Sequence, residues 1–234
     1  VKIAGFLSTI VDAESASYSF RHPRTGEWAH NLAHSVQEES WQTYLKPAWD
    51  FLCNHPAPIL RVVEVGFGRG FNIAELLRRF SLELPFKKLE VVAFEPFPEQ
   101  LEPWPDIPKP LVDWMPWWGK SAGFFADPEG HWKVQIHTQV AQQIDFWPEQ
   151  EIHLVILDLF SPARHPEQWQ EPLISTMSAK IAAGGQLCSY TVARSVRERL
   201  SNLGWQCHVR SETNRRDTLH AVFQAELSPG DARM

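Results

Sequence analysis

The sequence predicts one α/β domain with a mostly parallel sheet and helices on both faces, and three observations support this fold class. A run of strand character at 60–65 leads into a glycine-rich turn and a helical pattern, which is how a β-α-β unit begins. The run at 152–157 is mainly apolar, as expected of a parallel strand buried on both faces. The last two predicted strands are joined by a short polar turn, which predicts a C-terminal antiparallel hairpin.

The composition is that of an ordinary globular protein. Of 234 residues, 44% are hydrophobic and 21% are charged, and this length suffices for one α/β core with modest additions. No apolar run approaches the roughly 18 residues of a membrane span, so we expect no membrane association. Cys53, Cys188 and Cys207 lie far apart and form no CxxC pair, which predicts a cytoplasmic protein without a metal site.

Residues 1–55 are predicted to form an N-terminal extension that packs on the core. Turn residues at 22–26 separate two short runs of strand character, 18–20 and the run around Trp28, which predicts a small β-hairpin. From Val36 to Leu52 the apolar residues recur at helical spacing, which predicts a helix.

Residues 56–228 are the predicted core domain, followed by a tail at 229–234. Strands are predicted at 60–65, 89–94, 132–136, 152–157, 186–191, 205–210 and 218–226. Helices are predicted at 71–80, 171–183 and 192–203, the second ended by Gly184 and Gly185. Repeated β-α-β units that end in a β-hairpin are typical of the Rossmann-like sheet of class I S-adenosylmethionine-dependent methyltransferases.

A stretch rich in proline and tryptophan at 96–131 interrupts this pattern. One interpretation is a long excursion that packs on the sheet or forms one wall of the site. The other, equally supported, is an irregular connector with a local aromatic cluster.

The turn after the first core strand has the chemistry of a nucleotide-binding loop. Residues 64–70 read E-V-G-F-G-R-G, and glycines there permit positive φ and close approach of a ligand to a helix N-terminus. This arrangement suits either a dinucleotide or S-adenosylmethionine. The G-x-G-x-G spacing, rather than G-x-G-x-x-G, and the acidic Glu64 before the turn favour the methyl donor.

Two further carboxylates follow predicted strands. Glu95 comes directly after the strand at 89–94, where a carboxylate can accept hydrogen bonds from both ribose hydroxyls. Asp158 ends the strand at 152–157 and begins an acidic-aromatic-proline loop of the kind that amine methyltransferases use. A carboxylate there can orient an amine and relay its proton, whereas the aromatic residue can stack on a base. A turn-capping role for Asp158 is as well supported by this loop alone.

Several segments resemble one known family. Residues 158–169 read D-L-F-S-P-A-R-H-P-E-Q-W and resemble the D-G-F-[SA]-P-A-K-N-P-x-x-W signature of the MnmC methyltransferase-domain family. Residues 64–72 resemble its E-x-G-F-G-T-G-x-N element, 94–98 its F-E-K-F-P, 184–191 its G-G-T-L-A-T-Y-T, and 26–30 its G-E-x-Y-H. The resemblance runs from about residue 9 to 223, nearly the whole chain.

The resemblance implies an S-adenosylmethionine-dependent enzyme that methylates the 5-aminomethyl group of tRNA uridine 34. It implies that Asp158 is the catalytic carboxylate. The donor would be bound by Glu64, Gly66, Phe67, Gly68, Gly70, Asn72, Glu95, Pro96, Gln139 and Asp158. The acceptor would be bound by Glu27, His30, Phe160, Pro162, Arg194, Arg215 and Arg216.

The sequence also departs from the family pattern. Leu159 replaces a glycine beside the proposed catalytic residue, and residues 137–139 read H-T-Q where the family has a glycine-aspartate pair that contacts adenine. Many members carry a second, flavin-dependent oxidase domain that prepares the aminomethyl group. These 234 residues have no room for it, so we expect a stand-alone form that depends on an upstream enzyme.

The net charge bears on the tRNA prediction. At −6 it argues against a protein that coats nucleic acid by bulk electrostatics, but it permits a local basic patch. Residues 190–220 contain six arginines and only three acidic residues. This excess of positive charge favours contact with an anticodon stem-loop over an ordinary solvent-exposed helix face. The arginines are Arg194, Arg197, Arg199, Arg210, Arg215 and Arg216; the acids are Glu198, Glu212 and Asp217.

Three alternatives remain at the level of sequence. The first is a methyltransferase of the same fold that acts on a small-molecule or other amine. The second is an NAD-dependent oxidoreductase, for which we find no pyrophosphate-type glycine loop. The third is a non-catalytic Rossmann-like binding module, which the presence of Asp158 and the glycine turn disfavours.

Overall fold

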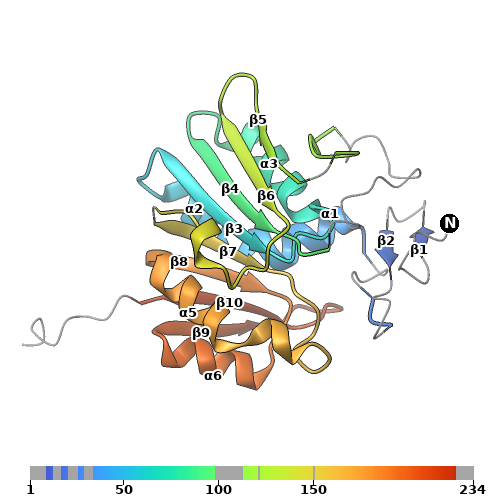
Figure 1. Cartoon of the computed structure of the whole chain (residues 1–234), viewed down its shortest axis with the longest axis vertical. Coiled ribbons are helices and arrows are strands. Elements are labelled where there is room, and N and C mark those ends of the chain that lie inside the picture. Colours follow the sequence, from blue (N-terminus) through green and yellow to red (C-terminus); the bar gives the residue numbers. More distant parts are fainter. Residues whose placement is uncertain are drawn as a thin grey trace, which may run out of the picture.

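The computed structural model describes residues 9–12, 17–20, 26–28, 34–97, 113–120, 122–149 and 151–224. Its centre is an eight-stranded sheet of order β5-β6-β4-β3-β7-β8-β10-β9 (Figure 1). The strands are β3 (Ile59–Val65), β4 (Lys88–Phe94), β5 (Phe124–Ala126), β6 (Trp132–His137), β7 (Ile152–Leu157), β8 (Ile181–Ser189), β9 (Trp205–Arg210) and β10 (Thr218–Phe223).

Strand directions confirm the predicted fold class. The five strands β6, β4, β3, β7 and β8 pair in parallel, whereas β10 pairs antiparallel with both β8 and β9. This is the Rossmann-like sheet of a class I methyltransferase with its C-terminal hairpin. The short edge strand β5, antiparallel to β6, was not predicted. It lies within the stretch at 96–131, where proline and tryptophan obscure any strand pattern.

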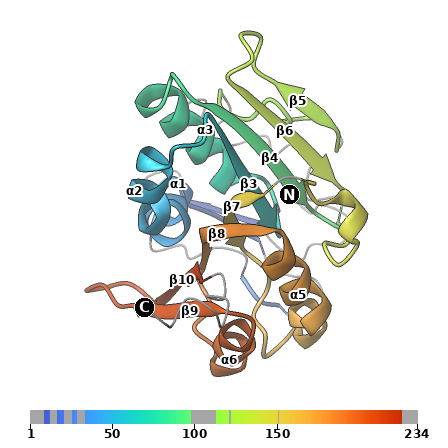
Figure 2. The ribbon, with the colours of Figure 1, turned by 90° about the vertical axis from the view of Figure 1, so that its left-hand side faces the viewer.

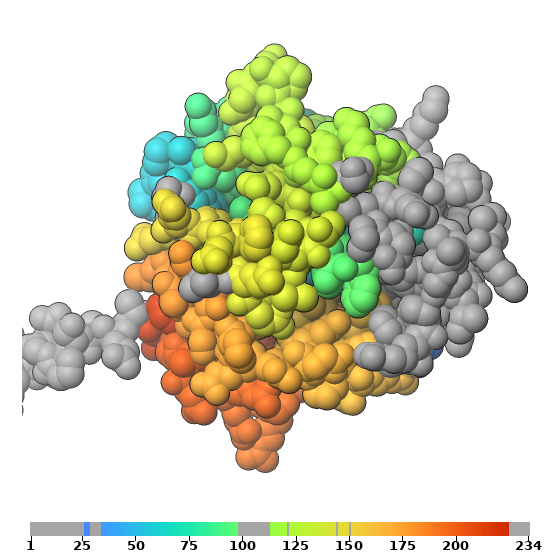
Figure 3. Space-filling model, viewed as in Figure 1, coloured from blue at the N-terminus to red at the C-terminus, as the bar shows by residue number. Residues whose placement is uncertain are grey.

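Helices cover both faces of the sheet (Figure 2). On one face lie α1 (Val36–Glu39), the π-helical turn η1 (Ser40–Leu45), α2 (Lys46–Asn54) and α3 (Phe71–Glu83). On the other face lie α5 (Glu171–Lys180) and α6 (Arg194–Asn202), with the short 3-10 turns η3 (Ile144–Phe146) and η4 (Pro166–Trp169) in the connections. The space-filling view shows the segments after β6, in yellow, above these orange helices (Figure 3).

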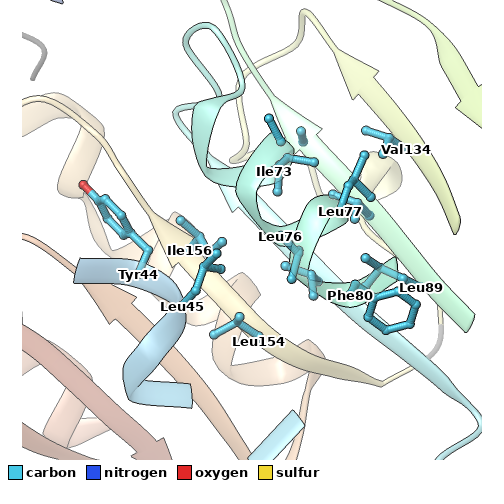
Figure 4. Close-up of a cluster of buried hydrophobic side chains, with 14 of the residues drawn as sticks. Tyr44, Leu45, Ile73, Leu76, Leu77, Phe80, Leu89, Val134, Leu154 and Ile156 are labelled. Carbon is cyan, nitrogen blue, oxygen red and sulfur yellow. The ribbon is translucent and has the colours of Figure 1, made fainter. Parts of the chain in front are cut away.

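The apolar face of α3 shows why this helix packs where it does. Ile73, Leu76, Leu77 and Phe80 recur at the i, i+3, i+4, i+7 spacing, and each is at most 1% exposed. They lie against the sheet beside strand residues such as Leu89 (Figure 4). Because α3 starts directly after the glycine turn, this packing fixes the position of that turn above the strands.

Two predicted boundaries are wrong. The helix at 171–183 ends at Lys180, and β8 begins at Ile181, so Gly184 and Gly185 lie inside a strand. The pairing with β7 shifts register between Ile152 and Leu154, which is a bulge, and Gly184 has a φ of 75°. The glycines therefore accommodate an irregular strand start and do not cap the helix.

The described hairpin of the N-terminal extension pairs β1 (Thr9–Asp12) antiparallel with β2 (Ser17–Phe20), and β1 was not predicted. The hairpin predicted across 22–26 lies largely outside the described residues. Residues 22–25 lie outside the described part of the chain, whereas Trp28 forms an isolated bridge. The predicted helix at 36–52 is present as α1, η1 and α2 in succession.

Candidate active site

A cavity of about 350 Å³ opens at the carboxyl ends of the central strands. Its walls come from the turn after β3, the segments after β4, β7 and β8, the turn between β9 and β10, and the helical stretch from residue 34. In open α/β sheets ligands bind at the carboxyl ends of the strands. The binding point is beside the strand from which successive strands are added first in one direction and then in the other. Here β3 occupies that place, between β4 and β7.

The glycine turn is built around two close approaches. Gly66 has a φ of 88°, and a Cβ on it would lie 2.3 Å from the carbonyl oxygen of Asp158. Gly70, with a φ of 79°, caps the N-terminus of α3, and its Cβ would lie 2.3 Å from the Phe67 ring. Both positions therefore require glycine, and the turn lies flat against the end of β7.

Glu95 is connected to this turn. Its Oε2 accepts the Gly68 backbone N–H at 2.6 Å, and its Oε1 accepts the Phe97 N–H at 3.0 Å. The residue is 4% exposed and still lines the cavity. Each carboxylate oxygen has a further lone pair, so Glu95 can also accept hydroxyl donors from a ligand.

Asp158 lies where three elements meet. Its backbone N–H donates to the Val65 carbonyl at 2.9 Å. Its side-chain Oδ1 accepts a hydrogen bond from the Tyr44 hydroxyl, and Oδ2 accepts one from Asn72 Nδ2 at 3.0 Å. The carboxylate that sequence reasoning proposed as catalytic is therefore oriented by two donors.

Glu64 lies beneath this arrangement and does not line the cavity. It is fully buried and accepts a hydrogen bond from Asn72 Nδ2 at 2.8 Å, while its Oε2 has no hydrogen-bond partner in the described part of the chain. Burial raises the pKa of Glu64 well above its usual range, and the nearby Asp158 and Glu95 carboxylates raise it further. Burial therefore favours the neutral form of Glu64, which supports Asn72 from below.

Sequence reasoning missed two tyrosines of the site. Tyr44 was assigned only to the buried side of a helix, and Tyr190 only to a strand. Burial raises the pKa of both phenols, and the Asp158 carboxylate nearby adds to the effect, so both remain protonated. Both line the cavity.

The loop after Asp158 is a folded unit. Trp169 Nε1 donates to the Phe160 carbonyl at 2.7 Å, which holds the two ends of the loop together. Ser161 donates through its N–H at 3.2 Å and its hydroxyl at 3.0 Å to the Glu27 carboxylate, which joins the N-terminal extension to the site. The specific proline and tryptophan pattern of this loop thus has a structural basis.

The structure places most, but not all, of the proposed site residues in the cavity wall. Those that line it are Glu27, Gly66, Phe67, Gly68, Asn72, Glu95, Pro96, Asp158, Phe160, Arg215 and Arg216. Those that do not are Glu64, Gly70, Gln139, Pro162 and Arg194, and His30 lies outside the described residues. Arg194 is on the outer helix α6, where its 85% exposed side chain pairs with Glu198 at 2.7 Å.

The arginines of the cavity rim are largely paired. Arg215 forms an ion pair with Glu38 of α1, and Arg210 pairs with Glu212 at 3.2 Å. Arg216 is exposed at the same rim. No cluster of His, Cys, Asp and Glu among the described residues could hold a metal ion, and no helix there is long and apolar enough to cross a membrane.

Comparison with known proteins decides the class of this site. Residues 123–224 match the model of a family described as S-adenosyl-L-methionine-dependent methyltransferase. This part of the chain therefore has the sequence of an S-adenosyl-L-methionine-dependent methyltransferase. The matched residues of this methyltransferase include Asp158 and the loop that follows it.

The fold is also similar to that of solved structures. MNMC2 from Aquifex aeolicus superposes with a TM-score of 0.77 at 22% identity, covering 96% of this chain and 72% of that one. The resemblance to the MnmC family drawn from the motifs is thus matched at the level of the fold. An rRNA methylase from Streptococcus thermophilus has a TM-score of 0.48 at 16% identity, covering 76% of this chain and 93% of that one. TrmN from Thermus thermophilus has a TM-score of 0.49 at 12% identity, covering 86% of this chain and 56% of that one.

The residues of the cavity fit the methyl donor. Gly66 and Gly68 of the turn line the cavity together with Phe71 and Asn72 from the first turn of α3, which suits the donor's carboxylate. Glu95 offers acceptor lone pairs for the ribose hydroxyls. The predicted adenine contact at Gln139 has no counterpart in the cavity wall.

Proposed function

We propose that this methyltransferase N-methylates the 5-aminomethyl group of the wobble uridine in tRNA, giving 5-methylaminomethyluridine or its 2-thio form. The observation that carries the proposal is the carboxylate of Asp158. It is oriented by Tyr44 and Asn72 and lies in the cavity wall directly beside the glycine turn. The family-like loop at 158–169 and the similarity to MNMC2 support the choice of acceptor.

The distribution of charge fits an amine attached to a polyanion. Around Asp158 the cavity wall carries the carboxylates Glu27 and Glu39, which favour an amino group. At the rim lie Arg215 and Arg216, which favour phosphate. An aminomethyl nucleoside within an RNA has both features.

The residues of this chain support methyl transfer as follows. When bound, S-adenosylmethionine supplies a methyl group whose bond to sulfur breaks as the acceptor nitrogen's lone pair forms the new N–C bond. Asp158 accepts a hydrogen bond from the neutral amine and so aims its lone pair. The same anion stabilises the positive charge that develops on nitrogen, and the resulting ammonium later loses its proton to solvent.

The test uses tRNA from cells that lack this modification, purified enzyme and isotopically labelled S-adenosylmethionine, with nucleosides identified by mass spectrometry. We expect labelled 5-methylaminomethyluridine with the wild-type enzyme and a loss of about two orders of magnitude or more in Asp158→Ala. Asp50→Ala is the matched control, because Asp50 is exposed on α2 and does not line the cavity. Normal turnover in Asp158→Ala would contradict the catalytic assignment.

A second candidate is a small-molecule amine, and one observation favours it. Arg210 and Arg215 are already paired with Glu212 and Glu38, which reduces the positive charge available to phosphate. In this case the labelled methyl group would appear on free amines and not on tRNA, although the donor would still bind. Since both candidates share the donor site, only the acceptor assay separates them.

A further inference from the structure

The hydrogen bond between Tyr44 and Asp158 joins residues that are 114 positions apart in the chain. Tyr44 is 4% exposed, and its ring packs beside Leu45 and Ile156 at the end of the core cluster, while its hydroxyl points away from that cluster (Figure 4). Only the hydroxyl end therefore serves the site, whereas the ring belongs to the core. The ring of Tyr44 therefore contributes to packing, whereas its hydroxyl is available for a role in the site.

The element that carries Tyr44 is irregular. In the π-helical turn η1 the Lys46 N–H donates to the Trp41 carbonyl, five residues back, so the helix is locally wider than an α-helix. Such turns cost some hydrogen-bond geometry and occur frequently at functional sites. The extra residue rotates the residues of η1 relative to those of α2 and sets the direction of Tyr44.

This helical stretch is anchored to α3, which also carries Asn72. Gln37 Nε2 donates to Glu75 Oε2 at 2.8 Å, and Trp49 Nε1 donates to Glu83 Oε2 at 2.8 Å. Tyr44 and Asn72 thus approach the two oxygens of Asp158 from elements that are fixed to each other.

We infer that Tyr44 is a positioning residue for methyl transfer, holding the Asp158 carboxylate ionised and oriented so that its remaining lone pairs face the acceptor nitrogen. This inference rests on the proposed function, in which Asp158 is the catalytic carboxylate. A hydrogen bond donated to a carboxylate stabilises its ionised form and fixes its rotation.

Tyr44 itself is not a base in this scheme. Burial raises the pKa of its phenol well above its usual range, and the nearby Asp158 and Glu39 carboxylates oppose a second negative charge. The hydroxyl therefore keeps its proton and remains a donor throughout the reaction.

The first test is Tyr44→Phe, which removes the donor and keeps the ring. Loss of a hydrogen bond to a charged group predicts a kcat lower by about ten- to one-hundred-fold. We expect the Kd for S-adenosylhomocysteine, measured by calorimetry, to change by less than about twofold, because the donor site of the glycine turn is untouched.

The second readout is the pH profile of kcat/KM. Without the Tyr44 donor the Asp158 carboxylate is easier to protonate, so the acidic limb of the profile moves to higher pH. The titratable and charged groups close to Asp158 and Tyr44 are Glu64 from β3, Glu95 after β4, Glu39 from α1, Tyr190 after β8, Glu27 from the extension and Arg216 from the rim. All of them are unchanged in the variant.

Trp205→Phe is the matched control. It also removes a hydrogen bond from a buried aromatic residue, the 2.8 Å bond from Trp205 Nε1 to Ser178 Oγ, but on the opposite face of the sheet. We expect it to lower the melting temperature and to leave kcat and the pH profile unchanged. A Tyr44→Phe enzyme that behaves in the same way would overturn the inference.

The double variant separates this inference from the proposed function. If Tyr44 acts through Asp158, adding Tyr44→Phe to Asp158→Ala causes no further loss of kcat. If the tyrosine change costs the same factor in both backgrounds, Tyr44 does not act through Asp158 and the inference fails. If Asp158→Ala alone retains normal turnover, the proposed catalytic role fails first.

Discussion

The α-carbon of Gly66 lies so close to the main chain of Asp158 that an added Cβ would be 2.3 Å from the Asp158 carbonyl oxygen. One glycine therefore sets both the shape of the turn that we propose binds the donor and the position of the carboxylate that we propose is catalytic. The two functions depend on the same contact and cannot be varied independently.

This contact predicts that Gly66→Ala impairs donor binding and stability together. The methyl group must displace the end of β7, which costs roughly 1–3 kcal/mol for an overpacked site and adds strain at positive φ. We expect the affinity for S-adenosylhomocysteine to fall by about tenfold or more, with a lower melting temperature. Gly184→Ala is the control, since it has a similar φ of 75° and its Cβ would meet nothing within 4 Å. Equal donor affinity in both variants would argue against the shared contact.

Glu95 provides a second test of the donor site. Its carboxylate accepts the Gly68 and Phe97 N–H groups, and in the proposed donor site it also accepts the ribose hydroxyls. Glu95→Ala should weaken binding of S-adenosylhomocysteine by about tenfold to one-hundredfold, because it loses both the ligand contact and the support of the turn. Glu95→Gln keeps one acceptor oxygen, so its affinity for S-adenosylhomocysteine in a calorimetric titration should lie between those of wild type and Glu95→Ala. An unchanged Kd in Glu95→Ala would exclude the ribose role.

His153 predicts a pH dependence of stability. Its Nδ1 accepts the Arg61 N–H at 2.9 Å, so the folded state requires the neutral ring. Burial, followed by the nearby His55 and the charges of Arg61 and Lys87, lowers the pKa of His153 from 6.5 to about 4. As the pH falls from 6.5 to about 4, the unfolded chain binds a proton that the folded chain does not. Stability is therefore lost across this window, on the order of 2–3 kcal/mol in all.

The measurement compares urea unfolding of wild type and His153→Asn between pH 7 and pH 4. Asparagine can still accept the Arg61 N–H but does not titrate, so its free energy of unfolding should fall less steeply with acid. His131→Asn is the control, because His131 lies at an exposed turn beside Asp127. Parallel pH curves for wild type and His153→Asn would show that His153 does not govern acid stability.

The rim arginines predict a difference in RNA affinity. Arg216 lies exposed at the cavity, whereas Arg194 pairs with Glu198 on the outer helix α6. Arg216→Ala should weaken tRNA binding severalfold and reduce the slope of log K against log salt by about one contact. Arg194→Ala should change neither quantity in a filter-binding or fluorescence titration. If Arg194→Ala weakened tRNA binding more than Arg216→Ala, the RNA-binding surface would lie on α6.

Much of the fold followed from the sequence because parallel strands and glycine turns have strong local patterns. The run at 152–157 and the turn at 66–70 were each placed correctly, and with them Asp158 at the strand end. Tyr44 was not, since helical spacing shows only that a residue faces the core. Its role depends on a π-helical turn and on a partner 114 residues away, and neither leaves a local signal. The β8 boundary failed for a similar reason, because its first residues pair with β7 through a bulge.

The position of β10 in the sheet has a consequence for synthesis. Although β10 is the last described strand in sequence, it lies between β8 and β9, and β9 pairs with no other strand in the described part of the chain. A nascent chain that has not yet released Thr218–Phe223 from the ribosome therefore cannot attach β9 to the sheet. The rim that joins β9 to β10 would form only after the residues up to Phe223 have emerged. During synthesis the glycine turn after β3 could therefore form before the β9–β10 rim proposed to contact the acceptor.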